Sequence, residues 1–329
     1  MTKSVSDIYG FQNHLSAEFP SQIVVDVTEH CNLECIHCPH SDLAFQGKKE
    51  KTHIDVGLHK KLIDEIVKDG QNICNYIRYT ANGEPLIHPR LIEMITYAGK
   101  KLNKTLLNLT TNGKILTKKR ARALLEAGVS VFDISIDAFT SETYAKIRKK
   151  GDLQVTKRNV LFLINEIRKF GFDSRVVVSF VEQPLNRSES SDFKKFWEES
   201  GVNYVVIRRL HSAAGAKKDF VKTETDRYPC LYPWERITLS ANGKLSFCPQ
   251  DWTHASEVSD FREVTIKEAW QGQKMKGLRN AHLNCMFSEY PICEKCEDWS
   301  TTRWPTQGRS YQDMMKEFTP KNVERKEEY

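Results

Sequence analysis

Cysteines are the side chains in this chain of 329 residues best suited to chemistry, and there are nine of them. Three follow one another closely at Cys31, Cys35 and Cys38. Spacing this tight favours metal ligation over disulfide bonds in a reducing compartment. Three thiolates hold three irons of a cubane iron–sulfur cluster and leave the fourth iron open to a substrate or cofactor. A tetrahedral zinc ion is the alternative, with His37 or His40 as its fourth ligand.

A second group of cysteines lies near the C-terminus. Cys230 and Cys248 flank the sequence Ala-Asn-Gly at 241–243, which is typical of a hairpin turn, and Cys293 and Cys296 form a close pair. A close pair combined with a hairpin pair frames a four-coordinate site for zinc or for an iron–sulfur cluster. Four cysteine ligands leave no iron open, so a cluster here would transfer electrons rather than bind substrate.

The remaining candidates are single residues. Cys74 begins a predicted interior strand and is most simply a small buried hydrophobic residue. Cys285 is either a thiol without a chemical role or a replacement for one of the four C-terminal ligands. Arg208, Arg209 and His211 follow the last predicted strand of the first half. They are suited to hold a phosphate or carboxylate or to act as a base toward an alcohol, unless they only mark the solvated end of that strand.

Strands and helices must position these side chains, and the sequence alternates regularly between apolar runs and amphipathic segments. It predicts strands over 22–28, 76–80, 105–110, 129–136, 175–181 and 204–207, and helices over 55–68, 89–101, 116–127, 141–149, 155–170 and 191–199. Strand and helix repeating in this way imply parallel βαβ units. We therefore predict an α/β fold, a partial TIM-like (β/α)6 barrel with its chemistry at the C-terminal strand ends.

The pattern changes after residue 210. A small, basic stretch over 211–218 is typical of a linker, and a hairpin over 235–247 and one amphipathic helix over 265–283 follow. A short helical pattern beyond residue 304 and a charged tail over 321–329 complete the chain. The predicted parts are an N-terminal extension (1–21), the barrel (22–210), a small hairpin-plus-helix extension (211–305) and a C-terminal helix and tail (306–329).

Composition excludes several function classes. The chain is 40% hydrophobic and 28% charged, which is ordinary for a soluble globular enzyme. Its net charge of +6 suits an anionic small substrate but is too small and too dispersed to predict nucleic-acid binding. Apolar runs fall short of the roughly 18 residues of a membrane span, and the first residues lack a signal-peptide pattern. We expect a cytoplasmic protein with neither nucleic acid nor membrane as its partner.

The cysteine triad has the spacing of the radical SAM (S-adenosylmethionine) superfamily, which this chain resembles over residues 22–210. Gly83-Glu84-Pro85, at the end of the second predicted strand, resembles the motif that holds the methionine amino group, and Gly83 permits close backbone approach. Asn82 stands where that family more commonly has glycine. The resemblance implies that the triad holds a [4Fe–4S] cluster that binds SAM.

Further motifs carry the same resemblance: 111–113 (Thr-Asn-Gly), 135–137 (Ser-Ile-Asp) and 144–148 (Tyr-Ala-Lys-Ile-Arg). Ser135 and Ser179 are the implied contacts to the SAM ribose or carboxylate, and His37 replaces the family's usual aromatic residue beside the adenine. The implied cofactor-binding residues are His37, Gly83, Glu84, Pro85, Asn112, Ser135, Asp137 and Ser179.

The C-terminal cysteines resemble the SPASM/twitch extensions of the same superfamily. The cysteine count fits the shorter twitch form with one auxiliary [4Fe–4S] cluster on Cys230, Cys248, Cys293 and Cys296. The implied cofactors are thus SAM and two [4Fe–4S] clusters, with an electron donor such as flavodoxin or ferredoxin as partner. The implied chemistry is reductive cleavage of SAM to a 5′-deoxyadenosyl radical that abstracts hydrogen from the substrate.

We expect a small-molecule substrate, with the two-electron oxidation of a carbohydrate or aminocyclitol alcohol as the preferred reaction. Arg208 or Arg209 would take the hydroxyl proton and the auxiliary cluster the second electron. One alternative is radical epimerisation with Cys285 as hydrogen-atom donor. Another is modification of a ribosomally made peptide.

Overall fold

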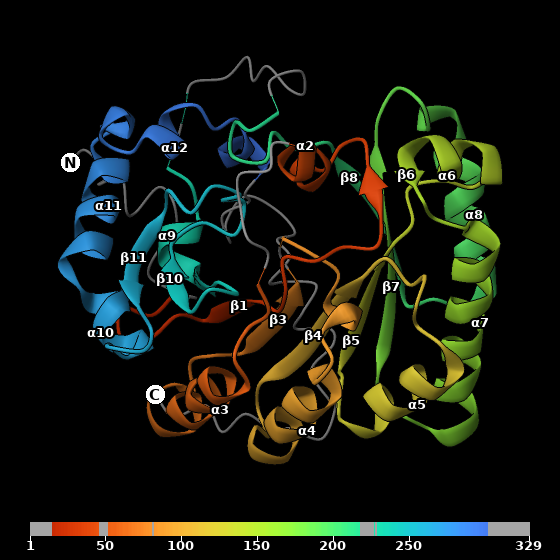
Figure 1. Ribbon diagram of the computed structural model, residues 1–329, viewed down its shortest axis with the longest axis horizontal. Helices are drawn as coiled ribbons and strands as arrows, with labels where there is room; N and C mark the ends of the chain where they lie inside the picture. The colour runs from red at the N-terminus through yellow and green to blue at the C-terminus, as the bar shows by residue number, and fades with distance from the viewer. Residues whose placement is uncertain (1–14, 46–51, 81, 218–226, 228, 302–329) are drawn as a thin grey trace, which may run out of the picture.

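Six parallel strands run through the molecule in sequence order (Figure 1). The computed structural model describes residues 15–45, 52–80, 82–217, 227 and 229–301. The strands are β1 (Gln22–Asp26), β3 (Tyr76–Thr80), β4 (Leu106–Thr111), β5 (Val131–Ser135), β7 (Arg175–Glu182) and β8 (Tyr204–Arg209). The helices between them are α3 (Val56–Glu65), α4 (Leu91–Lys101), α5 (Lys118–Glu126), α6 (Ser141–Ile147), α7 (Leu153–Phe170) and α8 (Ser190–Ser200). The predicted partial (β/α)6 barrel is confirmed, with every predicted strand and helix of residues 22–210 present.

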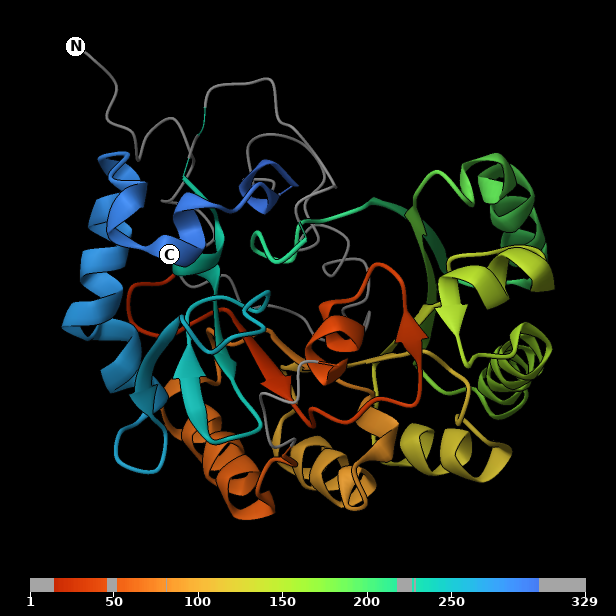
Figure 2. The ribbon, with the colours of Figure 1, turned by 45° about the horizontal axis from the view of Figure 1, so that its top comes forward.

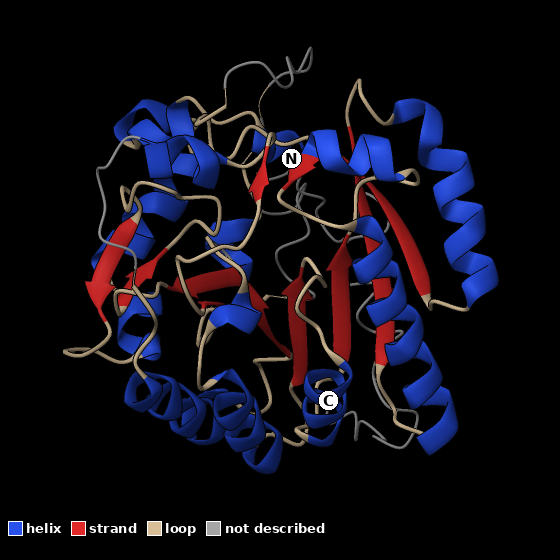
Figure 3. Cartoon of the chain, turned by 45° about the vertical axis from the view of Figure 1, so that its right-hand side comes forward, coloured by secondary structure: helices blue, strands red, loops and turns tan. Residues whose placement is uncertain are grey.

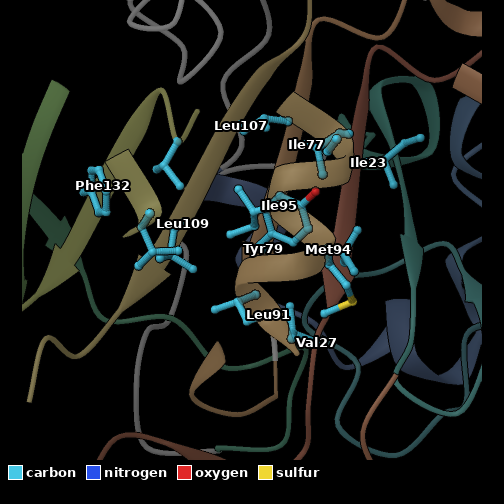
Figure 4. Packing of buried hydrophobic residues seen from close by; sticks show 14 of the residues in the cluster. Ile23, Val27, Ile77, Tyr79, Leu91, Met94, Ile95, Leu107, Leu109 and Phe132 are labelled. Atoms are coloured by element: carbon cyan, nitrogen blue, oxygen red, sulfur yellow. The ribbon is translucent and has the colours of Figure 1, made fainter. Parts of the chain in front are cut away.

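Side chains alternate between the two faces of each strand. Ile77 and Tyr79 of β3 join the large core between sheet and helices, whereas Tyr76 packs inside the barrel. Figure 4 shows the outer layer, where Leu91, Met94 and Ile95 of α4 lie against the strands. The inner face carries apolar residues at the N-terminal strand ends and polar residues toward the C-terminal ends. The inside of the barrel therefore becomes polar where the site is expected.

Side-chain caps fix where several helices begin. Asp55, Thr117, Thr140 and Asp152 each accept a backbone N–H from the first turn of α3, α5, α6 and α7, respectively. Helix α7 ends at Gly171, whose left-handed conformation glycine adopts without steric cost. These local signals hold the long outer helices over the sheet, as Figure 3 shows.

A second set of elements extends the same sheet. They are α9 (Tyr232–Glu235), β9 (Arg236–Leu239), β10 (Lys244–Ser246), β11 (Glu257–Asp260), α10 (Ile266–Gln271), α11 (Gln273–Leu283) and α12 (Pro291–Glu294). Strand β9 pairs in parallel with β1, and β10 and β11 follow antiparallel, giving one sheet of nine strands. The predicted hairpin is confirmed.

Two predictions for this region were wrong. The expected single helix over 265–283 is divided at Gly272, whose extended ψ of 164° ends α10 and starts α11. The expected linker is a packed turn over its described residues 211–217. Asp298 accepts the backbone N–H groups of Ser212 and Ala214, at 2.5 and 2.7 Å, and all three residues are buried.

Other expectations have simple outcomes. Cys74 is buried in the core, as predicted. The helical pattern beyond residue 304 and the charged tail lie outside the described residues. Among the helices that the structure describes, none is long and apolar enough to cross a membrane.

Candidate active site and second cysteine cavity

A cavity of about 280 Å³ opens at the C-terminal ends of the barrel strands. Cys31, Cys35 and Cys38 all line it. Helix α2 (Pro39–Phe45), which directly follows the triad, lies above the strand ends (Figure 2). The polar residues around the triad are His37, Arg78, Thr80, Glu84, Thr110, Thr111, Asn112, Ser135, Arg148, Ser179, Arg208, His211, Arg236 and Gln250.

A short antiparallel strand pair anchors the cysteine loop. Strand β2 (Glu34–Cys35) pairs with β6 (Arg148–Lys149), which places Cys35 opposite Arg148. The Arg148 guanidinium lies 3.9 Å from the Cys35 Sγ atom and donates to Asp137 at 2.5 and 2.8 Å. Arg148 and Asp137 are both buried. The loop is thus held by an ion pair close to one of the thiols.

The donor set of this cavity fits an iron–sulfur cluster. Burial raises the pKa of the Cys35 thiol to about 11 and also raises that of Cys31 and Cys38. Thiols in such a place ionise when a cation compensates the charge. No three Cys, His, Asp or Glu side chains of the described residues are grouped to hold one metal ion. A cluster binds each thiolate at a different iron, so its ligands need not converge on a single point.

Gly83 and Glu84 form the wall beside the triad. A Cβ atom at Gly83 would lie 2.2 Å from the carbonyl oxygen of Thr28, so only glycine permits this approach. The Glu84 carboxylate accepts the Thr111 hydroxyl at 2.6 Å and the Asn112 N–H at 2.7 Å. Burial raises the pKa of Glu84, although these hydrogen bonds oppose the shift. The 111–113 motif therefore orients the carboxylate.

Asn82 links this wall to the C-terminal part. Its side-chain amide donates to the carbonyl oxygen of Asp251 at 3.2 Å, and its backbone N–H donates to Asp26 at the end of β1. Asp251 lies in the loop that follows Cys248 and leads to Trp252, which also lines the cavity. The residue that departs from the family pattern thus joins the two halves of the molecule.

The implied cofactor-binding residues divide into two sets. Those lining the cavity are His37, Gly83, Glu84, Asn112, Ser135 and Ser179. Pro85 and Asp137 are absent from the described lining. Asp137 instead lies 3.6 Å from His37 Nε2 and binds Arg148. Burial lowers the pKa of His37 to about 4, so its ring is neutral.

An ion cluster forms the floor of the cavity. Asp133 of β5 is fully buried between Arg208 of β8 at 2.7 Å and Arg78 of β3 at 3.3 Å. Burial acts to raise the pKa of Asp133, but the two guanidiniums outweigh it and lower that pKa. Arg209 is exposed, since alternation along β8 directs it to the outer face. The structure therefore brings Arg208 and His211 into the cavity but leaves Arg209 outside.

The four C-terminal cysteines line a second cavity. Cys230, Cys248, Cys293 and Cys296 surround it together with apolar side chains. Burial raises the pKa of Cys293 to about 12 and that of Cys248 well above its ordinary value. Cys285 is exposed and belongs to the described lining of neither cavity. These four half-buried thiols fit a closed four-thiolate cluster, and Cys285 is not one of them.

Tyr232 and Gln250 line both cavities. One layer of side chains therefore separates the second cavity from the first.

Two further polar side chains face the second cavity. The Arg227 guanidinium donates to the carbonyl oxygens of Cys293 and Glu294, which holds the close cysteine pair in place. His282 of α11 accepts the Cys230 N–H at Nδ1. Burial lowers the pKa of His282 to about 4, which keeps its ring neutral.

Arg78, Arg236 and Gln250 are site residues that the sequence reasoning missed. A signal existed for Arg78, because it is the one charged residue of its strand and occupies an inward position between Tyr76 and Thr80. Arg236 and Gln250 reach the cavity only because β9 pairs with β1, a long-range contact with no local signal.

Two family profiles match the chain. The radical SAM superfamily profile matches residues 25–183, and the SPASM iron–sulfur cluster-binding domain profile matches residues 230–297. The SPASM match extends over both halves of the C-terminal cysteine set. It supports the predicted extension but not the choice of the twitch form.

Curated relatives include GTP 3',8-cyclases. That of Helicobacter pylori (strain HPAG1) is 32% identical over 283 residues, covering 75% of this chain and 84% of the relative. That of Alkaliphilus metalliredigens is 31% identical over 198 residues, covering 59% of this chain and 58% of the relative. The chain thus spans little more than half the length of some of the relatives it matches.

Solved structures with the same fold are more distant in sequence. BtrN in complex with AdoMet and 2-DOIA aligns with a TM-score of 0.57 at 18% identity, over 84% of this chain and 92% of that one. SuiB of Streptococcus suis bound to precursor peptide SuiA aligns with a TM-score of 0.63 at 12% identity, over 80% of this chain and 67% of that one. The cysteine cavities, the barrel and both profile matches agree: the chain belongs to the radical SAM superfamily, with SAM and iron–sulfur clusters as its cofactors, and carries a SPASM domain.

Proposed function

We propose that this enzyme oxidises an alcohol of a small polar substrate bound in the first cavity. Cys31, Cys35 and Cys38 would hold the SAM-binding cluster, and Gly83 and Glu84 would receive the methionine end of SAM beside it. When bound, SAM and its cluster supply a 5′-deoxyadenosyl radical, which takes a hydrogen atom from the substrate carbon.

The wall shared by the two cavities carries this proposal. After losing a hydrogen atom, an alcohol carbon must lose one electron and its hydroxyl proton to become a ketone. We propose that Cys230, Cys248, Cys293 and Cys296 hold the cluster that accepts this electron, while water accepts the proton. Tyr232 and Gln250 alone line both cavities among the described residues, so the acceptor lies one side-chain layer from the substrate.

The cavity floor favours a substrate with an anionic group. Arg78 and Arg208 both line the cavity, and both contact the Asp133 carboxylate. Guanidiniums bind phosphate or carboxylate through paired hydrogen bonds. A carbohydrate that carries such a group fits this floor better than a cationic aminocyclitol does.

Neither Arg208 nor Arg209, the two residues expected to act as a base, suits that role. A guanidinium stays protonated and has no acceptor lone pair. Arg208 is also ion-paired, and Arg209 faces away from the cavity. We therefore assign Arg208 to substrate binding and give Arg209 no role in the reaction.

Iron content and SAM cleavage test the two cluster assignments. The anaerobic enzyme should hold about eight irons, and the Cys293→Ala, Cys296→Ala variant about four. That variant should still cleave SAM to 5′-deoxyadenosine with dithionite but form no ketone. The Cys31→Ala, Cys35→Ala, Cys38→Ala variant should keep about four irons and cleave no SAM. Ketone formation by the first variant would refute the oxidation mechanism.

A second candidate function follows from the curated relatives. Their name, GTP 3',8-cyclase, and the cationic floor together favour radical cyclisation of a nucleoside triphosphate. Incubation of the reduced enzyme with GTP and SAM distinguishes the two reactions. Consumption of GTP with one 5′-deoxyadenosine per product would establish the cyclase, and unchanged GTP would exclude GTP as its substrate.

Epimerisation and peptide modification have less support. Epimerisation needs a thiol near the substrate carbon, and Cys285 is exposed. Loss of product in Cys285→Ala would nevertheless favour epimerisation over oxidation. SuiB's structure with its precursor peptide shows a related fold only, so peptide modification rests on no residue of this chain. Reduction by flavodoxin or ferredoxin stays a prediction.

A further inference from the structure

His282 is the histidine that lines the second cavity. It lies in the last turn of α11, is 2% exposed, and shares the cavity wall with the four cysteines. Its ring meets those of Trp234 and Phe287 edge-on, with centroids 6.1 and 5.3 Å away. These contacts hold the plane of the imidazole fixed against the cavity.

The hydrogen bond from Cys230 determines where the imidazole proton lies. The Cys230 backbone N–H donates to His282 Nδ1 at 3.3 Å, so Nδ1 carries a lone pair and the neutral ring carries its proton on Nε2. Nε2 is buried, and no described residue accepts a hydrogen bond from it. A buried donor without an acceptor is destabilising, and folded proteins leave few of them.

A cluster on the four cysteines supplies the missing acceptor. We propose that His282 Nε2–H donates a hydrogen bond to a sulfur of the auxiliary cluster and thereby makes that cluster easier to reduce. This inference rests on the proposed function of the four C-terminal cysteines. Reduction adds negative charge to the cluster, and a donor aimed at sulfur stabilises the reduced state more than the oxidised one. The low dielectric of the cavity strengthens the effect.

Other donors also line this cavity. Two nitrogens of the Arg227 guanidinium donate to the carbonyl oxygens of Cys293 and Glu294, whereas its Nε is buried without a partner in the described residues. Tyr232 and Gln250 lie in the wall shared with the first cavity, and the ¹⁵N-histidine label distinguishes His282 from all three. The rest of the described lining includes the apolar side chains of Pro233, Phe247 and Ile292. His282 does not touch the substrate. It is a positioning residue whose hydrogen bond raises the reduction potential of the auxiliary cluster.

Pulsed EPR on the full-length protein tests the hydrogen bond without altering His282. The Cys31→Ala, Cys35→Ala, Cys38→Ala background leaves only the auxiliary cluster, which is reduced in protein grown with ¹⁵N-histidine. We expect hyperfine coupling to one ¹⁵N nucleus and to one exchangeable proton. Reduced clusters without either coupling would overturn the inference.

Redox titration in the same background tests the consequence. His282→Phe removes the donor and should lower the equilibrium constant for reduction about tenfold, which is about 59 mV for a one-electron couple. His282→Gln, whose amide N–H can reach the same place, should recover most of the shift. His59→Phe is the matched control, because His59 is equally buried but bonds to Tyr79 in the barrel domain.

These experiments distinguish the assignment of the four cysteine ligands from the role of His282. A background protein without any cluster signal would refute the ligand assignment itself. A normal signal whose potential does not move in His282→Phe would refute only the role of His282. If His282→Phe fails to bind iron, the ¹⁵N coupling in the unmodified site decides the question.

Discussion

At the scale of single residues, Asn82 shows how one substitution joins two parts of the chain. Its amide reaches the carbonyl oxygen of Asp251, whereas glycine at this position would leave that oxygen without the contact. The bond holds the loop after Cys248 against the Gly83-Glu84 wall. Asn82 therefore couples the Gly83-Glu84 wall, where we propose that SAM binds, to the loop of the SPASM domain.

We predict that Asn82→Gly weakens SAM binding by about five- to tenfold, because a net loss of about 1 kcal/mol of hydrogen bonding loosens the wall. Equilibrium binding of SAM to the reconstituted enzyme measures the change. Asn103→Gly serves as the control, because Asn103 is exposed and its side chain accepts a hydrogen bond from Gln71, far from the cavity lining. Equal SAM affinity in both variants would contradict the coupling.

The site residues differ in how far the sequence could reveal them. Cys31, Gly83 and Asn112 lie in local motifs, and strand ends of a parallel sheet bring such motifs together. Arg209 was misassigned because two adjacent arginines on a strand necessarily face opposite sides. The contact between Asn82 and Asp251 spans 169 residues, and no local pattern predicts its partner.

At the scale of elements, the β2–β6 pair depends on a buried charge. Asp137 is fully buried and accepts Arg148, while its other oxygen accepts the Val181 N–H. Removing one partner of a buried pair leaves an uncompensated charge. The stability of the cysteine loop therefore depends on the ion pair between Arg148 and Asp137.

We predict that Arg148→Met lowers the free energy of unfolding by about 3–5 kcal/mol. Chemical unfolding followed by circular dichroism under anaerobic conditions measures it. Lys146→Met is the control, since the Lys146–Glu142 pair is exposed and surface ion pairs contribute little to stability. Adding Asp137→Asn should recover part of the loss in Arg148→Met, and no recovery would contradict the charge explanation.

Helix α3 carries a pH-sensitive residue. Burial lowers the pKa of His59 from 6.5 to about 3, and its Nε2 lies 2.9 Å from the Tyr79 hydroxyl. The unfolded chain binds a proton at this histidine below pH 6.5, whereas the folded chain does not. Stability from His59 is thus complete above pH 6.5 and is lost as the pH falls toward 3.

We predict that the fall in the free energy of unfolding between pH 7.5 and pH 5.0 shrinks by about 2 kcal/mol in His59→Phe. The comparison is between two pH values of one variant, so the packing change cancels. The pKa of the exposed His53 is also lowered by desolvation, but by less than that of His59, so His53→Phe should reduce the fall by a smaller amount. If the free energy of unfolding of His59→Phe fell as much between the two pH values as that of the parent, the pH effect could not be assigned to His59.

The secondary-structure prediction was correct where the hydrophobic periodicity was strong, and it was wrong where a helix breaks at Gly272. Strand 76–80 was predicted with its observed ends because alternation and bounding polar residues coincide there. Helix 265–283 was predicted as one element because isolated glycines such as Gly272 and Gly277 are compatible with a helix. The break at Gly272 has no local signal that distinguishes it from Gly277.

At the scale of the whole molecule, the barrel and the SPASM region share a sheet and a core. Strand β9 covers the edge of β1 through four residue pairs. Ile237, Leu245 and Trp270 belong to the same apolar cluster as Ile23 of β1. The predicted boundary at 210 separates sequence patterns, but the packing continues across it.

This continuity predicts that a fragment ending at residue 217 does not form a stable monomer. Removing β9 exposes the hydrogen-bonding edge of β1, and an exposed apolar edge strand pairs with other chains. Helix α3 also loses contacts, since Lys61 donates to the carbonyl oxygen of Val264 at 3.0 Å and Glu65 accepts the Lys267 N–H. Size-exclusion chromatography of residues 1–217 beside the full chain should show aggregates for the fragment alone. A monomeric fragment that binds four irons and cleaves SAM would instead show that the barrel folds independently of the domain that completes its sheet.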